Sequence, residues 1–213
     1  MNAAKIRSIA VEGVIGVGKT SLARAIAQQL GAHGYWEDDL PNPFLERFYA
    51  QRQRWGLACQ LRFLVERLRQ FRQSPPDHLP VVADHTIDKE LLFAQVNCEP
   101  DEYDLYRDIF TQLAVQCAFQ PQVVIYLSAD AQTLISRIRE RGRDMEGAID
   151  LSYLQALHHH YHGWFTGRGG ENHRVVVVDA DGHFIARDQP AVARLIEAAI
   201  AAPPGVSYCN PIG

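Results

Sequence analysis

Residues 13–20 read GVIGVGKT, which fits the phosphate-binding pattern G-x-x-x-x-G-K-[S/T]. An apolar run precedes this loop and a segment with helical spacing follows it, so the motif joins a predicted strand to a predicted helix. Its glycines let backbone N–H groups turn inward at the helix N-terminus, where the helix dipole also attracts anions. We therefore expect the loop to bind ATP or GTP, with Lys19 on the terminal phosphates and the Thr20 hydroxyl on magnesium. The residues predicted to contact the nucleotide here are Gly13, Val14, Ile15, Gly16, Val17, Gly18, Lys19, Thr20 and Ser21.

Apolar runs like the one at residues 6–11 recur at 80–83, 123–127 and 175–178. They are rich in β-branched residues and too short for helices, so we predict strands. The segment at 32–36 is a candidate for one more strand. Segments with helical spacing lie between the runs. This alternation predicts an α/β fold with a parallel, five-stranded sheet and helices on both faces.

The composition describes an ordinary globular chain of 213 residues, with 47% hydrophobic and 22% charged residues. We expect a single domain over residues 1–202 and a frayed tail over 203–213. The formal net charge of −4 leaves no excess of cations for duplex nucleic acid, so that partner is not expected. No apolar run reaches the roughly 20 residues of a membrane helix. Four widely spaced cysteines and no recognisable signal peptide favour a reduced, cytoplasmic protein.

Carboxylates follow several of the predicted strands. Asp84 ends the run at 80–83, Glu37 follows the candidate strand at 32–36, and Asp179 and Asp181 come after VVVV. Parallel sheets bind ligands beyond the carboxyl ends of their strands. We therefore expect these carboxylates on the same edge of the sheet as the phosphate-binding loop.

Closely spaced arginines occur in the stretch SRIRERGR, which contains Arg137, Arg141 and Arg143. Arginines that close over phosphates stabilise phosphoryl transfer, which favours a kinase. Because a glutamate is interleaved, a solvated helix face of mixed charge is the alternative. Gly142 interrupts the helix where a lid would hinge, so we predict a lid over residues 137–148. The guanine-reading sequence N-K-x-D is absent, which argues against a GTP-dependent switch.

From residue 9 to about residue 181 the sequence resembles the deoxynucleoside kinase family, in particular its bacterial deoxyadenosine/deoxyguanosine kinase branch. The resemblance rests on an ordered combination of stretches and not on the phosphate-binding loop alone. These stretches are IAVEGVIGVGKTSLA, WEDDLPNPFLERFYAQRQRWGLACQ, VVADHTIDKELLFA, VIYLSADAQTLISRIRERGR and DLSYLQALHHHYHGW.

The resemblance implies an ATP-dependent kinase that phosphorylates the 5'-hydroxyl of a deoxynucleoside, with a purine base favoured. Glu37 matches the general base that accepts the hydroxyl proton. Gln60 matches the glutamine that reads the base, and Glu90 is expected to contribute to base preference. Tyr49 and Glu146 match the residues that hold the sugar 3'-hydroxyl.

On the donor side, the resemblance implies that the three lid arginines grip the ATP phosphates. Asp84 matches the acid that steadies magnesium through water, and the segment with Asp179 and Asp181 resembles the one that senses the donor's base. One position departs from the family pattern of an acid followed by Arg and Ser. Here Asp84 is followed by His85 and Thr86, so His85 is expected at a substrate-binding position with only part of an arginine's charge at neutral pH.

Two other functions stay open at this point. A nucleoside-monophosphate kinase of the thymidylate kinase type shares the loop, the lid arginines and the sheet. Its anionic acceptor needs an acceptor-side arginine with no carboxylate base beside it, whereas the acidic run Glu37, Asp38 and Asp39 favours a neutral acceptor. A nucleotide-dependent switch or regulatory protein is the second. The resemblance also implies a homodimer formed through helices, and the apolar stripe at residues 103–117 could serve either that contact or the core.

Overall fold

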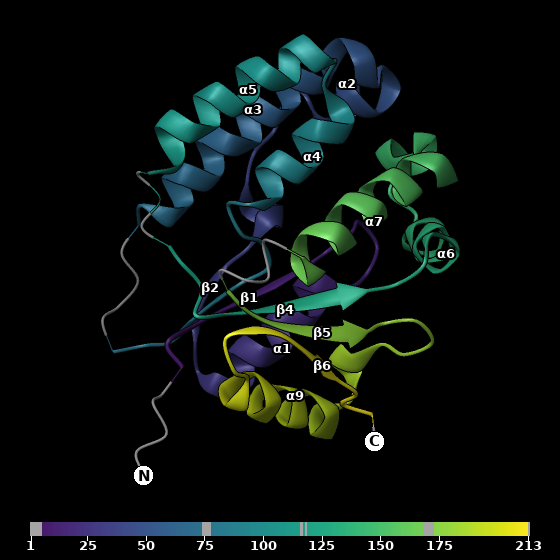
Figure 1. Cartoon of the computed structure of the whole chain (residues 1–213). Coiled ribbons are helices and arrows are strands. Elements are labelled where there is room, and N and C mark those ends of the chain that lie inside the picture. The colour runs from purple at the N-terminus through teal and green to yellow at the C-terminus, as the bar shows by residue number, and fades with distance from the viewer. Residues whose placement is uncertain (1–5, 74–77, 116, 118, 168–172, 213) are drawn as a thin grey trace.

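The computed structural model describes residues 6–73, 78–115, 117, 119–167 and 173–212. Helices and strands alternate along most of the chain (Figure 1). The strands are β1 (Ser8–Gly13), β2 (His33–Tyr35), β3 (Val81–Ala83), β4 (Val123–Ser128), β5 (Arg174–Asp179) and β6 (Gly205–Cys209). The longer helices are α1 (Lys19–Leu30), α2 (Leu45–Ala50), α3 (Arg52–Phe71), α4 (Lys89–Asn97), α5 (Pro100–Ala114), α6 (Ala131–Arg141), α7 (Leu151–Thr166) and α9 (Gln189–Ala201). Short 3-10 turns are η1 (Glu37–Asp39), η2 (Asp144–Ala148) and η3 (Ile185–Arg187).

The strands form one parallel sheet in the order β2-β3-β1-β4-β5-β6. The predicted α/β fold is therefore confirmed. In the register of the central strands, Ala10 of β1 faces Ala83 of β3 on one side and Val124 of β4 on the other. Strand β4 is buried from Val123 to Leu127, as its unbroken apolar sequence requires of a strand covered on both faces.

The predicted number of strands is wrong, because the sheet has six. The sixth, β6, lies in the segment that we expected to be a frayed tail, where Val206 pairs with Val175 of β5. It occupies the edge of the sheet and its side chains are only partly buried, so the sequence lacks the continuous apolar run that marks the inner strands.

Helices cover both faces of the sheet. Helices α1 and α9 pack together on one face, and α7 lies on the other against β4 and β5. Beyond α7, helices α3, α4 and α5 pack against one another, and α2 joins α3 (Figure 1). Among the described residues, no helix combines the length and apolar character needed to cross a membrane.

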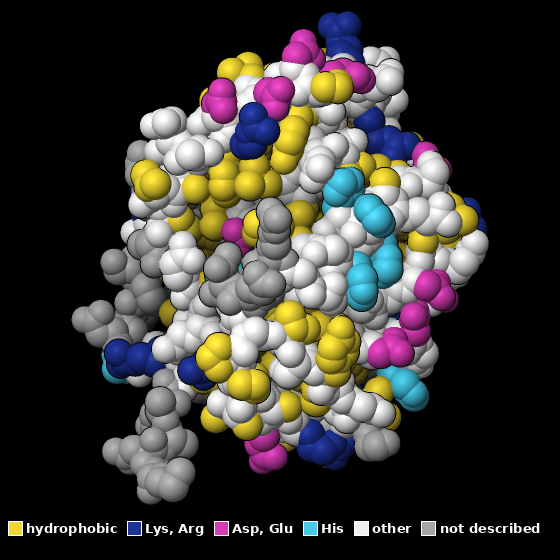
Figure 2. All heavy atoms as spheres, viewed as in Figure 1, with side chains coloured by type: hydrophobic (Ala, Val, Ile, Leu, Met, Phe, Trp, Pro, Cys, Tyr) yellow, Lys and Arg dark blue, Asp and Glu magenta, His cyan; other side chains and the backbone are white. Residues whose placement is uncertain are grey.

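The segment at residues 103–117, which holds the predicted apolar stripe, is divided between the core and the surface. Tyr106 and Phe110 of α5 are buried, whereas Leu105 and Val115 are 52% and 83% exposed. Figure 2 shows hydrophobic atoms gathered over this group of upper helices. The stripe therefore supplies the core, whereas Leu105 and Val115, which lie outside its spacing, leave apolar surface in solvent.

Removal of β6 tests its part in the fold. We expect a chain ending at Ala202 to lose several kcal/mol of unfolding free energy relative to the full chain, because each lost ladder hydrogen bond contributes about 1 kcal/mol net. Urea denaturation measures this difference. The matched control ends at Cys209, so it keeps β6 and lacks only residues 210–213. Equal stability of the two shortened chains would show that β6 adds nothing to the sheet.

Candidate active site

A cavity of about 960 Å³ opens at the carboxyl edge of the sheet, between the phosphate-binding loop, helices α2, α3 and α4, and the segment α6–η2. Most of the predicted site residues line it: Ile15, Gly16, Gly18, Lys19, Thr20, Ser21, Glu37, Tyr49, Gln60, Arg137, Arg141, Arg143 and Glu146. The other predicted residues are not part of its lining: Gly13, Val14, Val17, Asp84, His85, Glu90, Asp179 and Asp181.

The phosphate-binding loop is held by close packing at two glycines. A Cβ atom on Gly13 would lie 2.6 Å from the carbonyl oxygen of Leu127, so no larger residue fits between β1 and β4. A Cβ atom on Gly16 would lie 2.9 Å from Cγ1 of Ile138 in α6. Both glycines also have positive φ, which other residues rarely adopt. The loop is thus packed directly against the helix that carries Arg137 and Arg141.

Lys19 is buried at the start of α1, where its Nζ donates a hydrogen bond to the Val14 carbonyl oxygen at 3.3 Å. Burial lowers the pKa of Lys19 to about 8, and the charge of the nearby Lys89 acts in the same direction. The carboxylates of Glu37, Glu12 and Asp84 act in the opposite direction, and a bound phosphate would favour the charged form further.

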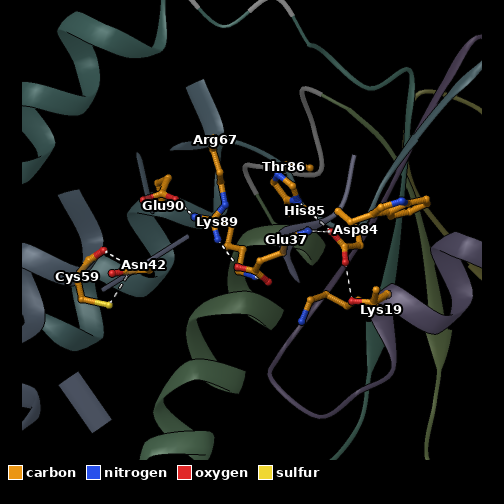
Figure 3. A network of polar contacts seen from close by, with 12 residues as sticks. Lys19, Glu37, Asn42, Cys59, Arg67, Asp84, His85, Thr86, Lys89 and Glu90 are labelled. Carbon is orange, nitrogen blue, oxygen red and sulfur yellow. Dashed lines mark hydrogen bonds and ion pairs between the residues drawn. The ribbon is translucent and has the colours of Figure 1, made fainter. Parts of the chain in front are cut away.

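Asp84 connects the phosphate-binding loop to the segment that carries Glu37 (Figure 3). Its Oδ2 accepts a hydrogen bond from Thr20 Oγ1 at 2.5 Å, and its Oδ1 accepts one from the Glu37 backbone N–H at 2.8 Å. The same Oδ1 lies 3.0 Å from Nδ1 of His85. Burial raises the pKa of Asp84, but the hydrogen bond from His85 leads the effects that bring it below its usual value. Asp84 is therefore ionised.

Glu37 points toward two cations that the sequence analysis did not identify (Figure 3). Its Oε2 lies 2.6 Å from Nζ of Lys89, and its Oε1 is bonded to Arg67. Burial works against ionisation, but the charges of Lys89 and Arg67 hold the pKa of Glu37 well below its usual range. With a side chain that is 25% exposed, Glu37 is a carboxylate that a bound molecule can reach.

Arg67 lines the cavity and forms a buried pair with Glu90, which does not line it. Arg67 lies between the carboxylates of Glu37 and Glu90, and the Tyr106 hydroxyl donates to Glu90. Arg67 stands about two helical turns after Gln60, so the helical spacing of α3 was the available signal for it. The fully buried Glu12 was also missed; its Oε1 accepts hydrogen bonds from the backbone N–H and the hydroxyl of Thr86, at 2.6 and 2.9 Å.

His85 is fully buried and stacked on Phe71, with ring centroids 4.9 Å apart. Its position behind Asp84 keeps it out of the cavity lining, so the structure does not bring it to the other predicted substrate residues. Burial lowers the pKa of His85. The residue is therefore a neutral partner of Asp84 and supplies no permanent charge to the cavity.

The predicted lid arginines lie along one side of the cavity. Arg141 forms two hydrogen bonds with Glu146, at 2.7 and 2.6 Å, and Arg143 lies 3.3 Å from Asp38. Arg137 donates to the Ala180 carbonyl oxygen at 2.7 Å. Helix α6 ends at Gly142 in a left-handed conformation, as the sequence predicts for the end of this helix.

The segment after β5 contributes different residues from those predicted. Asp181 accepts hydrogen bonds from the Asp130 backbone N–H at the start of α6, and Asp179 accepts one from the Asp181 N–H. Phe184 and Arg187 line the cavity instead, and the guanidinium carbons of Arg137 and Arg187 lie 5.4 and 5.2 Å from the Phe184 ring centroid.

Comparison with known proteins identifies the family of the chain. The sequence matches the family model described as "Deoxynucleoside kinase" over residues 9–200. The chain belongs to the deoxynucleoside kinase family. It is 35% identical to the deoxyguanosine kinase of Bacillus subtilis (strain 168) over 153 residues, which covers 70% of this chain and 73% of that one. It is 32% identical to the deoxyadenosine/deoxycytidine kinase of the same organism over 166 residues, covering 75% and 76%.

A solved structure of the family has the same fold. The deoxyadenosine kinase from M. mycoides with bound dATP superimposes with a TM-score of 0.77 and 25% identity, covering 89% of this chain and 97% of that one. The family match favours a deoxynucleoside kinase over the thymidylate kinase type and over a nucleotide-dependent switch.

The lowered pKa of Lys19 predicts that ATP binding takes up a proton at a pH just above about 8. Part of the free protein then carries a neutral Lys19, and the bound phosphates restore its charge. Calorimetric titrations in buffers of different ionisation enthalpy measure the uptake. In the same pH range we expect the affinity for ATP to fall as pH rises. Binding without proton uptake would contradict the role of Lys19 as a phosphate ligand.

Proposed function

We propose that this kinase transfers the γ-phosphoryl group of ATP to the 5'-hydroxyl of a deoxynucleoside, with a preference for purine deoxynucleosides. The observation that carries the proposal is the ionised Glu37 carboxylate, which lies in the same cavity as Lys19 of the phosphate-binding loop. A carboxylate at this place suits a neutral hydroxyl acceptor, because a second phosphate there would meet like charge.

Glu37 is the proposed general base. As the 5'-oxygen forms its bond to the γ-phosphorus, the bond from that phosphorus to the oxygen of ADP breaks and Glu37 accepts the hydroxyl proton. General-base catalysis by a positioned carboxylate contributes about 10² to 10⁴ in rate. Its low pKa keeps Glu37 in the form that can accept a proton.

Cations on the donor side stabilise the transferring group. The proposed ligands of the ATP phosphates are Lys19 with the loop N–H groups, and Arg137, Arg141 and Arg143 from the lid. An arginine that reaches the transferring phosphoryl group is worth about 10³ to 10⁵ in rate. The proposed donor-base contacts at Asp179 and Asp181 receive no support from the cavity lining, whereas Phe184 and Arg187 offer a ring and a guanidinium there.

Magnesium is the proposed metal. The Thr20 hydroxyl lines the cavity and donates its hydrogen bond to the Asp84 carboxylate at 2.5 Å, so its oxygen keeps lone pairs for an ion, and oxygen is the donor that Mg²⁺ prefers. Asp84, which is not part of the cavity lining, would act on the ion through water. The residues therefore fit the ion. When bound, Mg²⁺ supplies positive charge that neutralises the phosphate oxygens.

The nucleoside is proposed to bind on the other side of Glu37. Tyr49 and Glu146 would hold the sugar 3'-hydroxyl, and Gln60 would read the base with its amide. Glu90 and its partner Arg67 lie close behind this region, so they are proposed to influence base preference. The names of the relatives, which include deoxyguanosine and deoxyadenosine kinases, support a purine base.

We also propose that the protein is a cytoplasmic homodimer, in which the exposed Leu105 and Val115 take part in the contact. An exposed apolar patch of this kind often marks a protein–protein interface.

A substrate panel tests the proposed function. The protein is incubated with Mg-ATP and each deoxynucleoside or deoxynucleoside monophosphate, and the products are separated by chromatography. We expect nucleoside 5'-monophosphates, formed fastest from purine deoxynucleosides. Diphosphates formed only from monophosphates would instead indicate a thymidylate kinase type of enzyme. ADP with no phosphorylated acceptor would contradict the proposal.

Glu37→Gln tests the general base. The amide cannot accept the proton, so we expect kcat to fall by about 10² to 10⁴. Deoxynucleoside affinity, measured by calorimetry, should change little because the side chains have the same shape. Asp39→Asn is the control, since Asp39 is exposed and is not part of the cavity lining. Near-normal turnover of Glu37→Gln would remove Glu37 from the mechanism.

A further inference from the structure

The acceptor side of the cavity needs a cation of its own. A carboxylate that approaches a triphosphate is repelled by it, and this repulsion rises as the two anions come together around the attacking oxygen. Lys19 and the loop N–H groups serve the donor phosphates from the other side. The cation must therefore come from a residue that contacts Glu37 and also faces the cavity.

His85 and Arg67 do not meet this requirement. His85 is neutral, is fully buried against Phe71 and does not line the cavity. Arg67 lines the cavity, but its charge is shared between the carboxylates of Glu37 and Glu90. A cation balanced by two anions contributes little net charge to a third.

Lys89 meets it. Its Nζ lies 2.6 Å from Oε2 of Glu37, its side chain is 3% exposed, and it lines the cavity. Among the described residues, Glu37 is the one carboxylate within 4.0 Å of it, and the charge of Lys89 also acts on the buried Glu12 from farther away. The ammonium carries three N–H donors, so donors remain for a ligand. The ring of Phe93, 5.1 Å from Nζ, lies beside it and helps to fix the side chain.

The fold sets the place of Lys89. It is the first residue of α4, which follows β3 and the Asp84 hydrogen-bond network. Lys19 of α1 is close enough for the two ammonium groups to affect each other. Two cations that line the cavity, one from α1 and one from α4, thus lie near the region in which Glu37 would meet the γ-phosphate.

We propose that Lys89 is a catalytic residue of the phosphoryl transfer, in which its ammonium holds Oε2 of Glu37 and hydrogen-bonds an oxygen of the transferring phosphoryl group. Lys89 brings the base and the phosphoryl group together by offsetting their repulsion. As Glu37 takes up the hydroxyl proton and loses its charge, its attraction for the Lys89 ammonium weakens. The ammonium then interacts mainly with the phosphoryl oxygens. The assignment rests on the proposed function and adds to it the source of positive charge on the acceptor side.

Lys89→Met tests this role, because it keeps the length of the side chain and removes its charge. We expect the single-turnover rate of phosphoryl transfer to fall by about 10² to 10³, the usual effect of losing one charge-stabilising donor. Deoxynucleoside and ATP dissociation constants, measured by calorimetry, should change by less than about fivefold. Lys89→Arg should recover at least about tenfold of the lost rate.

A transition-state mimic separates catalysis from structure. We expect Lys89→Met to weaken binding of ADP with aluminium fluoride, in the presence of the deoxynucleoside, by about the same factor as the rate, whereas binding of a non-hydrolysable ATP analogue stays unchanged. Arg107→Met is the matched control, because Arg107 is a 52% exposed cation on α5, paired with Asp104. This control should retain the full rate.

The outcomes separate the two proposals. If the unaltered enzyme phosphorylates no deoxynucleoside, the proposed function fails. Two results with an active unaltered enzyme would overturn the role of Lys89 and leave the proposed function standing. The first is a Lys89→Met rate within about threefold of normal, and the second is an equal loss of ground-state and transition-state binding. A Lys89→Arg protein with a normal melting temperature that recovers none of the lost rate also overturns that role.

Discussion

The burial of charge around Glu37 is the constraint on which the rest of the site depends. An unpaired ion inside a protein is strongly disfavoured, and Glu37 and Glu90 each have a cation at hydrogen-bonding distance. Glu37 pairs with Arg67 of α3 and with Lys89 of α4, and Glu90 pairs with the same Arg67. These helices cannot slide relative to each other or to the end of β2 without separating a pair. The ion pairs of the site therefore also fix how α3 and α4 pack against each other.

Asp84 extends this constraint to the sheet. A single carboxylate accepts hydrogen bonds from the Thr20 hydroxyl and from the Glu37 backbone, and it also holds His85. It therefore fixes the start of α1 relative to the segment after β2. Because Gly16 brings the loop against α6, the base, the phosphate-binding loop and the lid helix have little freedom to move independently. The cavity is organised before any substrate enters.

Local patterns in the sequence predicted the parts of the structure that depend on local physics. The phosphate-binding loop, the inner strands and the end of α6 at Gly142 each have such a pattern. Strand β6 does not, because an edge strand needs only partial burial. Lys89 was missed because its pairing with Glu37, between α4 and η1, leaves no local signal. Arg67 was missed although the helical spacing of α3 places it about two turns after Gln60. His85 and Asp181 follow β3 and β5, but neither lines the cavity as expected, because nearby groups of the protein already use their polar atoms.

The strand order also affects when the phosphate-binding loop can fold during synthesis. Strand β1, which leads into the phosphate-binding loop, lies between β3 and β4, and the Ser8 backbone N–H bonds to Gln122, 114 positions along the chain. Contacts so distant in sequence form slowly, because closing the intervening loop costs entropy. During synthesis the loop remains without one of its two neighbouring strands until β4 has left the ribosome. The ability to hold a nucleotide is therefore acquired late, after more than half of the polypeptide has emerged.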